Sequence, residues 1–141
     1  MLIAYPAPVS WDVIILRFPD VDHIREIPDG FRPEPLGARD DVIAAVLAAA
    51  PQVDFSDPSW GSLSGAGFSI ELGTGEKDVV ESVMLFIRGG GDELLPAVHT
   101  IVAAIGGRAW DCSSGQFLDR SDATEGLARW QAYRDQVIGD G

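Results

Sequence analysis

The pattern of apolar and polar positions predicts four β-strands in this chain. Residues 11–18 and 80–88 are apolar on both alternating sets, which is typical of strands covered on two faces. Residues 67–72 alternate apolar with polar side chains, so this strand has one solvated face, on which we expect Glu71. A shorter strand is predicted at residues 108–112.

A helical period predicts three helices. They run from residue 40 to 50, from about 93 to 105, and from about 123 to 138. Pro51 ends the first helix, and the Gly106–Gly107 pair ends the second. The expected N-terminal capping residues are Asp40, Asp92, and Asp122 with Glu125.

The segments between these elements are predicted to be connectors. Residues 19–38 hold four prolines and two glycines, so we expect a loop with one short helical turn around Ile24. Residues 51–67 form a second connector rich in turn residues, and residues 73–78 a hairpin loop. Residues 116–118 fit a short returning strand after a Ser-Ser-Gly turn.

This order of elements predicts a single α+β domain over residues 1–141. Its first six elements match the ferredoxin-like split β-α-β sandwich, a four-stranded sheet with two helices, to which an extra C-terminal helix is added. That topology places strands 11–18 and 80–88 side by side in the centre of the sheet, with Leu85 and Ile87 in the core. The final helix, or alternatively a partner chain, is expected to cover apolar residues on the other sheet face, such as Met84 and Phe86.

The charge of the chain restricts its partners. Asp and Glu number 22 against 10 Lys and Arg, a formal net charge of −12, while 46% of the residues are hydrophobic. A folded acidic domain repels nucleic acid and anionic membranes, and it attracts basic partners. The single cysteine, Cys112, excludes an internal disulfide, and the longest apolar run is too short to span a membrane. With no secretion signal recognised, we expect a cytoplasmic protein.

The motifs that suggest catalysis or ligand binding also have structural interpretations. Residues 88–92 (RGGGD) join a strand to a helix, but they lack the Lys-Ser/Thr of a phosphate-binding loop, and a structural turn is favoured. His23 and Glu26 are three residues apart without a third metal ligand. We therefore predict no metal and no cofactor. Nothing singles out a catalytic pair of carboxylates among the 22 acids.

Cys112 is the one candidate nucleophile. A catalytic thiol needs a neighbouring base and an electropositive setting, whereas Asp111 beside it raises the thiol pKa. A cysteine at the end of a strand is the favoured interpretation, and we predict no enzyme.

Trp60 is the strongest candidate for a binding residue. It follows Asp54 and Asp57 in a turn-rich segment, and an aromatic anchor among acids fits an interface for a basic protein. Packing within the loop is the alternative. The predicted acidic patch consists of Asp54, Asp57, Trp60, Glu71 and Asp92.

Several segments carry a resemblance to known proteins. The chain is similar over roughly residues 30–135 to a group of small acidic uncharacterised bacterial proteins, and in size and charge it resembles toxin-neutralising immunity proteins. The resemblance implies no catalytic residues and fixes no toxin. The segments are Asp54 with Trp60-Gly61, Phe68–Leu72, Val83–Leu85, Arg88–Asp92 and Asp111–Asp119.

These observations favour a non-enzymatic binding protein. The most concrete form is an immunity protein or antitoxin that neutralises a basic bacterial toxin by protein–protein binding. A small-ligand-binding or regulatory module, dimeric through its sheet, is the first alternative, and an enzyme that uses Asp111 or Cys112 is the second. An apolar cavity of ligand size would favour the first alternative, and a histidine near Cys112 the second.

Overall fold

The computed structural model describes residues 10–119, 127–128 and 131–132. Within these residues, seven strands form one antiparallel sheet in the order β3-β4-β5-β7-β1-β8-β9, and β2 pairs with β6 separately. The strands are β1 (Trp11–Leu16), β2 (Gly37–Ala38), β3 (Asp54–Asp57), β4 (Trp60–Gly65), β5 (Phe68–Gly73), β6 (Val79–Val80), β7 (Ser82–Gly89), β8 (Arg108–Asp111) and β9 (Gln116–Phe117).

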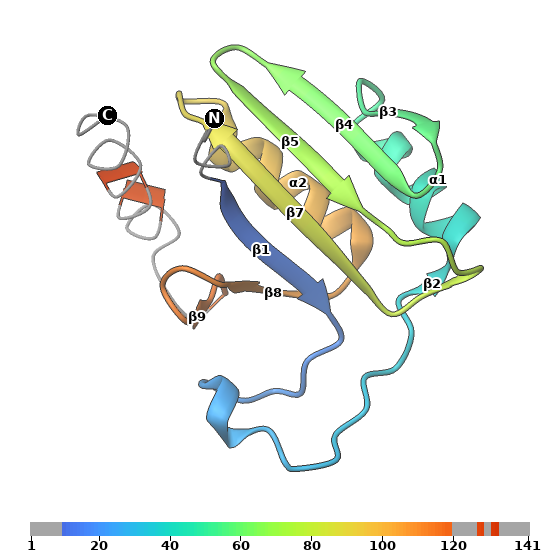
Figure 1. Ribbon diagram of the computed structural model, residues 1–141, viewed down its shortest axis with the longest axis vertical. Coiled ribbons are helices and arrows are strands. Elements are labelled where there is room, and N and C mark those ends of the chain that lie inside the picture. Colours follow the sequence, from blue (N-terminus) through green and yellow to red (C-terminus); the bar gives the residue numbers. More distant parts are fainter. Residues whose placement is uncertain (1–9, 120–126, 129–130, 133–141) are drawn as a thin grey trace, which may run out of the picture.

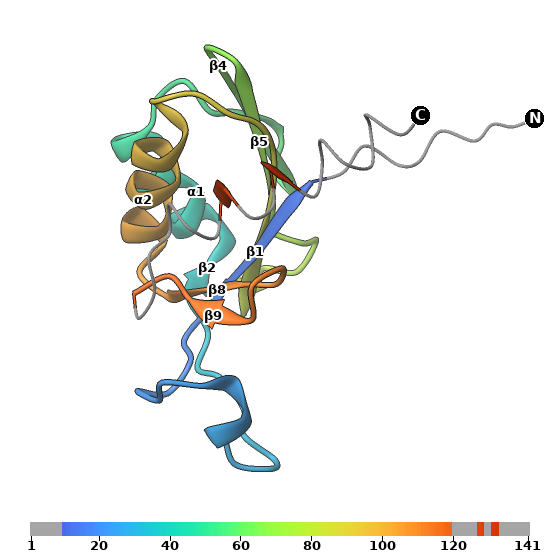
Figure 2. The ribbon, with the colours of Figure 1, turned by 90° about the vertical axis from the view of Figure 1, so that its left-hand side faces the viewer.

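Two α-helices cover one side of the large sheet. Figures 1 and 2 show α1 (Arg39–Ala49) and α2 (Leu94–Ile105) together on that side. The long loop between β1 and β2 projects away from this body and contains the 3-10 helix η1 (Ile24–Glu26), which confirms the predicted helical turn. None of the described elements lies across the opposite side of the sheet.

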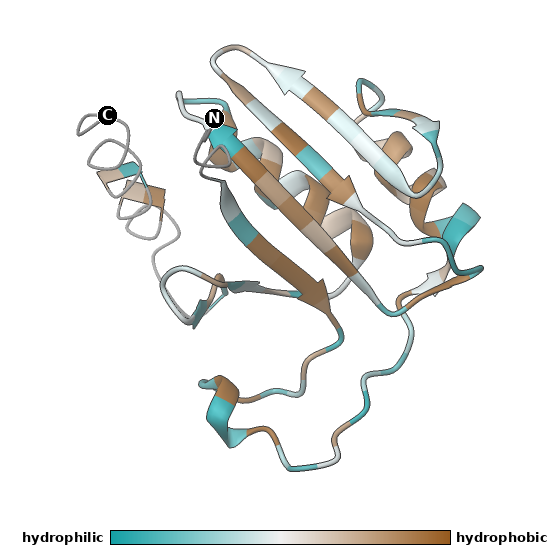
Figure 3. Cartoon of the chain, in the orientation of Figure 1, coloured by the Kyte–Doolittle hydropathy of each residue, from teal (hydrophilic) through white to brown (hydrophobic). Residues whose placement is uncertain are grey.

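The core lies between the helices and the two central strands. Trp11, Val13 and Ile15 of β1 are fully buried, as are Val83, Leu85 and Ile87 of β7, while the residues between them are partly exposed. Figure 3 shows the corresponding apolar bands along both strands. The helices contribute further core residues: Val42, Val46, Leu94, Val98, Ile101 and Ile105. The prediction that Leu85 and Ile87 are core residues is confirmed.

The pairing of the two central strands is confirmed as well. β1 and β7 are antiparallel neighbours inside the sheet, with Val13 opposite Leu85. β5 lies on the other side of β7, and β8 on the other side of β1. Cover on the second face, which the sequence also predicted, is not seen among the described elements, because Ile14, Met84 and Phe86 stay partly exposed on the side opposite the helices.

The four-stranded ferredoxin-like sandwich with an extra C-terminal helix is wrong. The described residues form a seven-stranded antiparallel sheet and a two-stranded sheet with two α-helices. The extra strands come mainly from residues 51–67, predicted as a connector, where β3 and β4 extend the sheet beyond β5. Glycine and serine make this segment resemble a loop, although Gly61 and Leu63 are buried in alternation with exposed neighbours.

Gly61 has a packing role within β4. A Cβ there would lie 2.6 Å from the ring of Phe55 on β3, so the aromatic side chain occupies the space that a larger residue would need. The glycine that suggested a turn therefore permits close packing inside a strand.

The predicted caps Asp40 and Asp92 are also wrong. The N-cap positions are Ala38 for α1 and Glu93 for α2, and neither side chain caps its helix. Backbone contacts replace them, because Arg39 N–H donates to the carbonyl of Asp78 and Leu94 N–H to that of Gly91. The predicted end of α2 is confirmed, since Gly106 adopts a left-handed φ of 86°.

Of the predicted final helix, residues 127–128 and 131–132 are described and helical. Leu127 is buried in the core, and the Gln131 amide donates to the Gly89 carbonyl at 3.4 Å. The remainder, including Asp122 and Glu125, lies outside the described residues.

Within the described parts, no helix is long and apolar enough to cross a membrane.

Candidate partner-binding site

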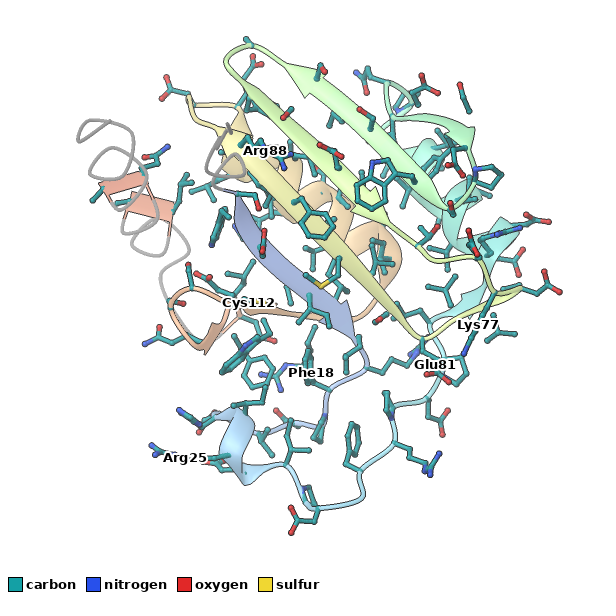
Figure 4. All side chains as sticks on the ribbon, viewed as in Figure 1. Phe18, Arg25, Lys77, Glu81, Arg88 and Cys112 are labelled. Atoms are coloured by element: carbon teal, nitrogen blue, oxygen red, sulfur yellow. The ribbon has the colours of Figure 1, made fainter. Side chains whose placement is uncertain are left out.

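The side of the sheet opposite α1 and α2 carries a mixture of acidic and aromatic residues. Figure 4 looks onto this side, which we call the open face, with α2 behind the sheet. Cross-strand pairing places its residues, because paired residues project to the same side. Those on the strands from β3 to β1 include Asp12, Ile14, Asp54, Asp57, Trp60, Ser62, Glu71, Gly73, Met84, Phe86 and Arg88.

One row of paired residues crosses five strands of the open face. Asp54 of β3 pairs with Ser62, Ser62 with Glu71, Glu71 with Phe86, and Phe86 with Asp12 of β1. Three of these five residues are acidic. The register therefore arranges carboxylates from residues far apart in the sequence along one line.

Trp60 belongs to the adjacent row, between Asp57 of β3 and Gly73 of β5, and its side chain lies across β5. It pairs with Gly73, and a Cβ at Gly73 would lie only 3.3 Å from the indole Cζ3 atom. The indole stacks on Phe86 with ring centroids 5.5 Å apart and an interplanar angle of 21°. Trp60 remains 42% exposed. The absence of a side chain at Gly73 thus allows an exposed indole to cover part of Phe86.

Glu71 fixes the orientation of this indole. Its Oε2 accepts the Trp60 Nε1–H at 2.8 Å, and its Oε1 accepts from Arg88 Nη1 at 2.7 Å. Both carboxylate oxygens are therefore used within the face. The prediction that Glu71 faces away from the core is confirmed by its partial exposure and its pairing with Phe86.

Asp54 and Asp57 are exposed on β3, and neighbouring serines hold their carboxylates. Asp54 Oδ1 accepts from the hydroxyl and backbone N–H of Ser56, and Asp57 Oδ1 accepts likewise from Ser59. These hydrogen bonds lower the pKa of each aspartate below its ordinary value. Asp57 pairs directly with Trp60, so a negative charge lies beside the exposed indole.

Four of the five predicted site residues thus share the open face, and Asp92 does not join them. Trp60 lies in the row of Met84, whereas Asp92 follows Gly89, the last residue of β7. Five residues of extended chain separate Met84 from Gly89, roughly 17 Å. Asp92 is therefore at the far end of the sheet.

The glycine loop before Asp92 is used structurally. Gly89 has a φ of 90°, and a Cβ there would lie 2.2 Å from the Gly67 carbonyl oxygen. That same carbonyl accepts the Gly90 N–H. Close approach of two backbones explains the glycines, in agreement with the favoured structural interpretation.

The alternative catalytic residues are in an unfavourable setting for nucleophilic chemistry. Cys112 is exposed, but partial burial of its thiol and the negative charges of Asp12 and Asp111 raise the pKa of the thiol. Asp111 is buried and accepts three hydrogen bonds through Oδ1, from Ser113 N–H and hydroxyl and from Ser114 N–H. Its Oδ2 is buried without a hydrogen-bond partner. The contacts of Asp111 thus stabilise the turn that follows β8.

His23 and Glu26 are engaged locally in the loop. His23 Nδ1 accepts the Arg25 N–H, and Glu26 accepts the Asp22 N–H. Across the described parts of the chain, no group of three or more His, Cys, Asp or Glu residues could hold a metal ion.

Sequence reasoning missed four contributors to the face: Asp12, Gly73, Phe86 and Arg88. Phe86 was recognised only as an apolar residue in need of cover, and Arg88 only as part of a glycine loop. Their role depends on strand register between distant segments. The alternation within each strand was the available signal, and it indicates the face but not the neighbours.

A groove of about 300 Å³ lies on another part of the molecule. It is bounded by the end of α1, the start of α2 and the β4–β5 hairpin, with Ala49, Leu63, Phe68, Glu93, Ala97 and Thr100 among its lining residues. The groove lies on the helix-covered side, so it is separate from the open face.

No protein-family model matches this chain, and comparison with curated proteins finds no match.

Proposed function

We propose that this chain is a non-enzymatic binding protein whose open face docks onto a basic protein. The observation that carries the proposal is the meeting of Asp54, Asp57, Trp60 and Glu71 on the open face, which no described element covers. An exposed aromatic side chain supplies buried apolar area in a complex, and the surrounding carboxylates supply attraction to a positive surface.

The preorganisation of Trp60 supports this function. Its side chain is held by the hydrogen bond to Glu71 and by stacking on Phe86 before any partner binds. An anchor that is already ordered loses less conformational entropy on association. The net charge of −12 adds long-range attraction to a basic protein.

The specific role we propose is that of an immunity protein or antitoxin that neutralises a basic bacterial toxin. The resemblance to small acidic bacterial proteins and the acidic face both favour this role. Binding alone is sufficient for it, because an acidic surface that covers a basic active site blocks access of substrate. No turnover by this chain is required.

Matched affinity baits test the function. The wild-type protein is compared with Asp54→Lys/Asp57→Lys and with Asp29→Lys/Glu34→Lys, which changes the charge equally on the exposed loop away from the face. We expect a basic partner to be retained by the wild type and by the loop variant and lost by the β3 variant. Co-expression of the identified partner then measures neutralisation. Equal retention by all three baits would refute the proposed face.

The groove between the helices favours a second function, the binding of a small apolar ligand. Its volume is at the lower end of the range for ligand sites, and much of its lining is apolar. Ala97→Trp would fill it, while Ala103→Trp on the same helix lies outside the lining and serves as control. A small molecule that stabilises the wild type and the control, but not the filled variant, in thermal melts would support this alternative.

A further inference from the structure

We propose that the centre of the open face receives an arginine side chain of the basic partner, with its guanidinium stacked on the Trp60 indole. The inference deepens the proposed function and rests on it, because it names the contact that would anchor the partner. It commits the open face, which no described element covers, to one occupant, a basic protein segment that contains arginine.

The first step is the availability of an ordered aromatic surface. Trp60 is 42% exposed, although its indole is stacked on Phe86 and its N–H is bonded to Glu71. The polar atom of the indole is thus hydrogen-bonded within the face, so a partner would meet the indole through its aromatic ring. The π-surface of tryptophan is the strongest aromatic acceptor for a cation.

The second step is the balance of charge around the indole. Asp57 pairs with Trp60 directly, and Asp54, Glu71 and Asp12 occupy the neighbouring row. Among the described open-face residues of β3, β4, β5, β7 and β1, Arg88 is the one base, and it forms an ion pair with Glu71 at 2.7 Å. Asp54 and Asp57 use Oδ1 for serine hydrogen bonds, and no described residue donates to their Oδ2 atoms, although the positive charge of Arg39 on α1 also acts on Asp57. The face therefore carries a negative excess beside its aromatic surface.

Charge complementarity selects the occupant. A second copy of this chain would place the acidic residues of one open face against those of another, which is unfavourable. A basic segment removes this repulsion. Arginine fits better than lysine, because its planar guanidinium stacks on an aromatic ring while its N–H groups reach a carboxylate such as Asp57.

The test uses two acetylated, amidated peptides, one alternating glycine with arginine and one alternating glycine with lysine, each with six cations. Each is titrated at low ionic strength into the full chain, with the Trp60 indole N–H followed by NMR. We expect this resonance to shift and the arginine peptide to bind about two- to fivefold more tightly. Trp60→Ala should abolish that preference. Ile24→Ala, which removes an exposed apolar side chain from the loop, should preserve it.

Equal affinity for both peptides, an unchanged preference in Trp60→Ala, or no binding of either peptide would overturn the inference. A dimer detected by sedimentation that depends on Trp60 would overturn it too, since a second copy would then occupy the face. If the charge reversal at Asp54 and Asp57 leaves binding of the native partner unchanged while the preference for the arginine peptide depends on Trp60, the proposed function fails and the arginine contact stands. If the charge reversal abolishes binding of the native partner but neither peptide is preferred, the proposed function stands and the arginine contact is wrong.

Discussion

Glu71 holds the Trp60 indole through a 2.8 Å hydrogen bond that spans two adjacent strands. The two residues are diagonal neighbours, since Glu71 pairs with Ser62 and Trp60 with Gly73. Their contact converts an exposed tryptophan into an ordered feature of the sheet surface. The same carboxylate accepts a hydrogen bond from Arg88, so Glu71 orders one side chain from β4 and one from β7.

We expect loss of the Glu71 carboxylate to release Trp60 without unfolding the protein. Glu71→Ala removes the acceptor for the indole and the ion-pair partner of Arg88, whereas Glu71→Gln retains one oxygen acceptor. Because the ion pair is partly exposed, the stability cost should be no more than about 1 kcal/mol. Acrylamide quenching of Trp60 fluorescence, isolated by subtracting the Trp60→Phe variant, should rise more for alanine than for glutamine. Equal quenching in all variants would mean that Glu71 does not order the indole.

A side chain at Gly73 should displace Trp60. The Cβ of Gly73→Ala would lie 3.3 Å from the indole, and Gly73→Val adds two methyl groups there. Gly73 is not among the residues with positive φ, so the backbone itself tolerates both changes. We expect nuclear Overhauser contacts between Trp60 and Phe86 to weaken with alanine and vanish with valine. Contacts preserved in Gly73→Val would show that the indole does not lie over β5.

The core of β7 should dominate stability. Leu85 and Ile87 have no exposed surface, so changing either residue to alanine should cost about 2–5 kcal/mol in the free energy of unfolding. Val79→Ala is the control, because Val79 is 50% exposed and an exposed change costs within about 0.5 kcal/mol. Urea titration measures all three. Losses at Leu85 and Ile87 no larger than at Val79 would contradict the assigned burial.

Cys112 should react slowly with alkylating reagents at neutral pH. Although Cys112 is exposed, partial burial of the thiol and the charges of Asp12 and Asp111 disfavour the thiolate, so the pKa is raised and the reactive fraction at pH 7 is reduced. The midpoint of the pH–rate profile should exceed that of a cysteine in an unstructured peptide. Asp12→Asn removes one negative charge and should lower it, while Asp54→Asn, on the distant β3 edge, should not. A midpoint at or below the peptide value would contradict this setting.

The sequence pattern predicts the two central strands, because the apolar residues of each strand show directly that it is buried. Residues such as Val13 and Leu85 lie in continuous apolar runs, and their strands pair in the centre of the sheet. β3 and β4 were missed because Gly61 and the serines of β4 have the composition of a loop. Their strand conformation depends on the ring of Phe55 above Gly61 and on pairing with β5, which are tertiary effects.

The candidate site could be predicted only in part, because tertiary contacts also decide which residues meet there. Trp60 and the aspartates before it are close in sequence, so their proximity required no knowledge of the fold. Glu71 was placed on a solvated strand face by its alternation. Asp92 was included on charge alone, and the sheet register separates it from Trp60. The stacking of Trp60 on Phe86 joins β4 to β7 and cannot be read from either segment.

The association kinetics of the identified partner test the central claim most directly. For the wild type, the association rate should fall as salt rises, because the Debye length shrinks from about 10 Å at 0.1 M to about 3 Å at 1 M. Asp54→Lys/Asp57→Lys should slow association, and Trp60→Ala should mainly speed dissociation. The equally charged Asp29→Lys/Glu34→Lys control should retain clearly faster association than the β3 variant. Unchanged rates in both open-face variants, with the fold intact, would contradict the assignment of this face as the binding surface.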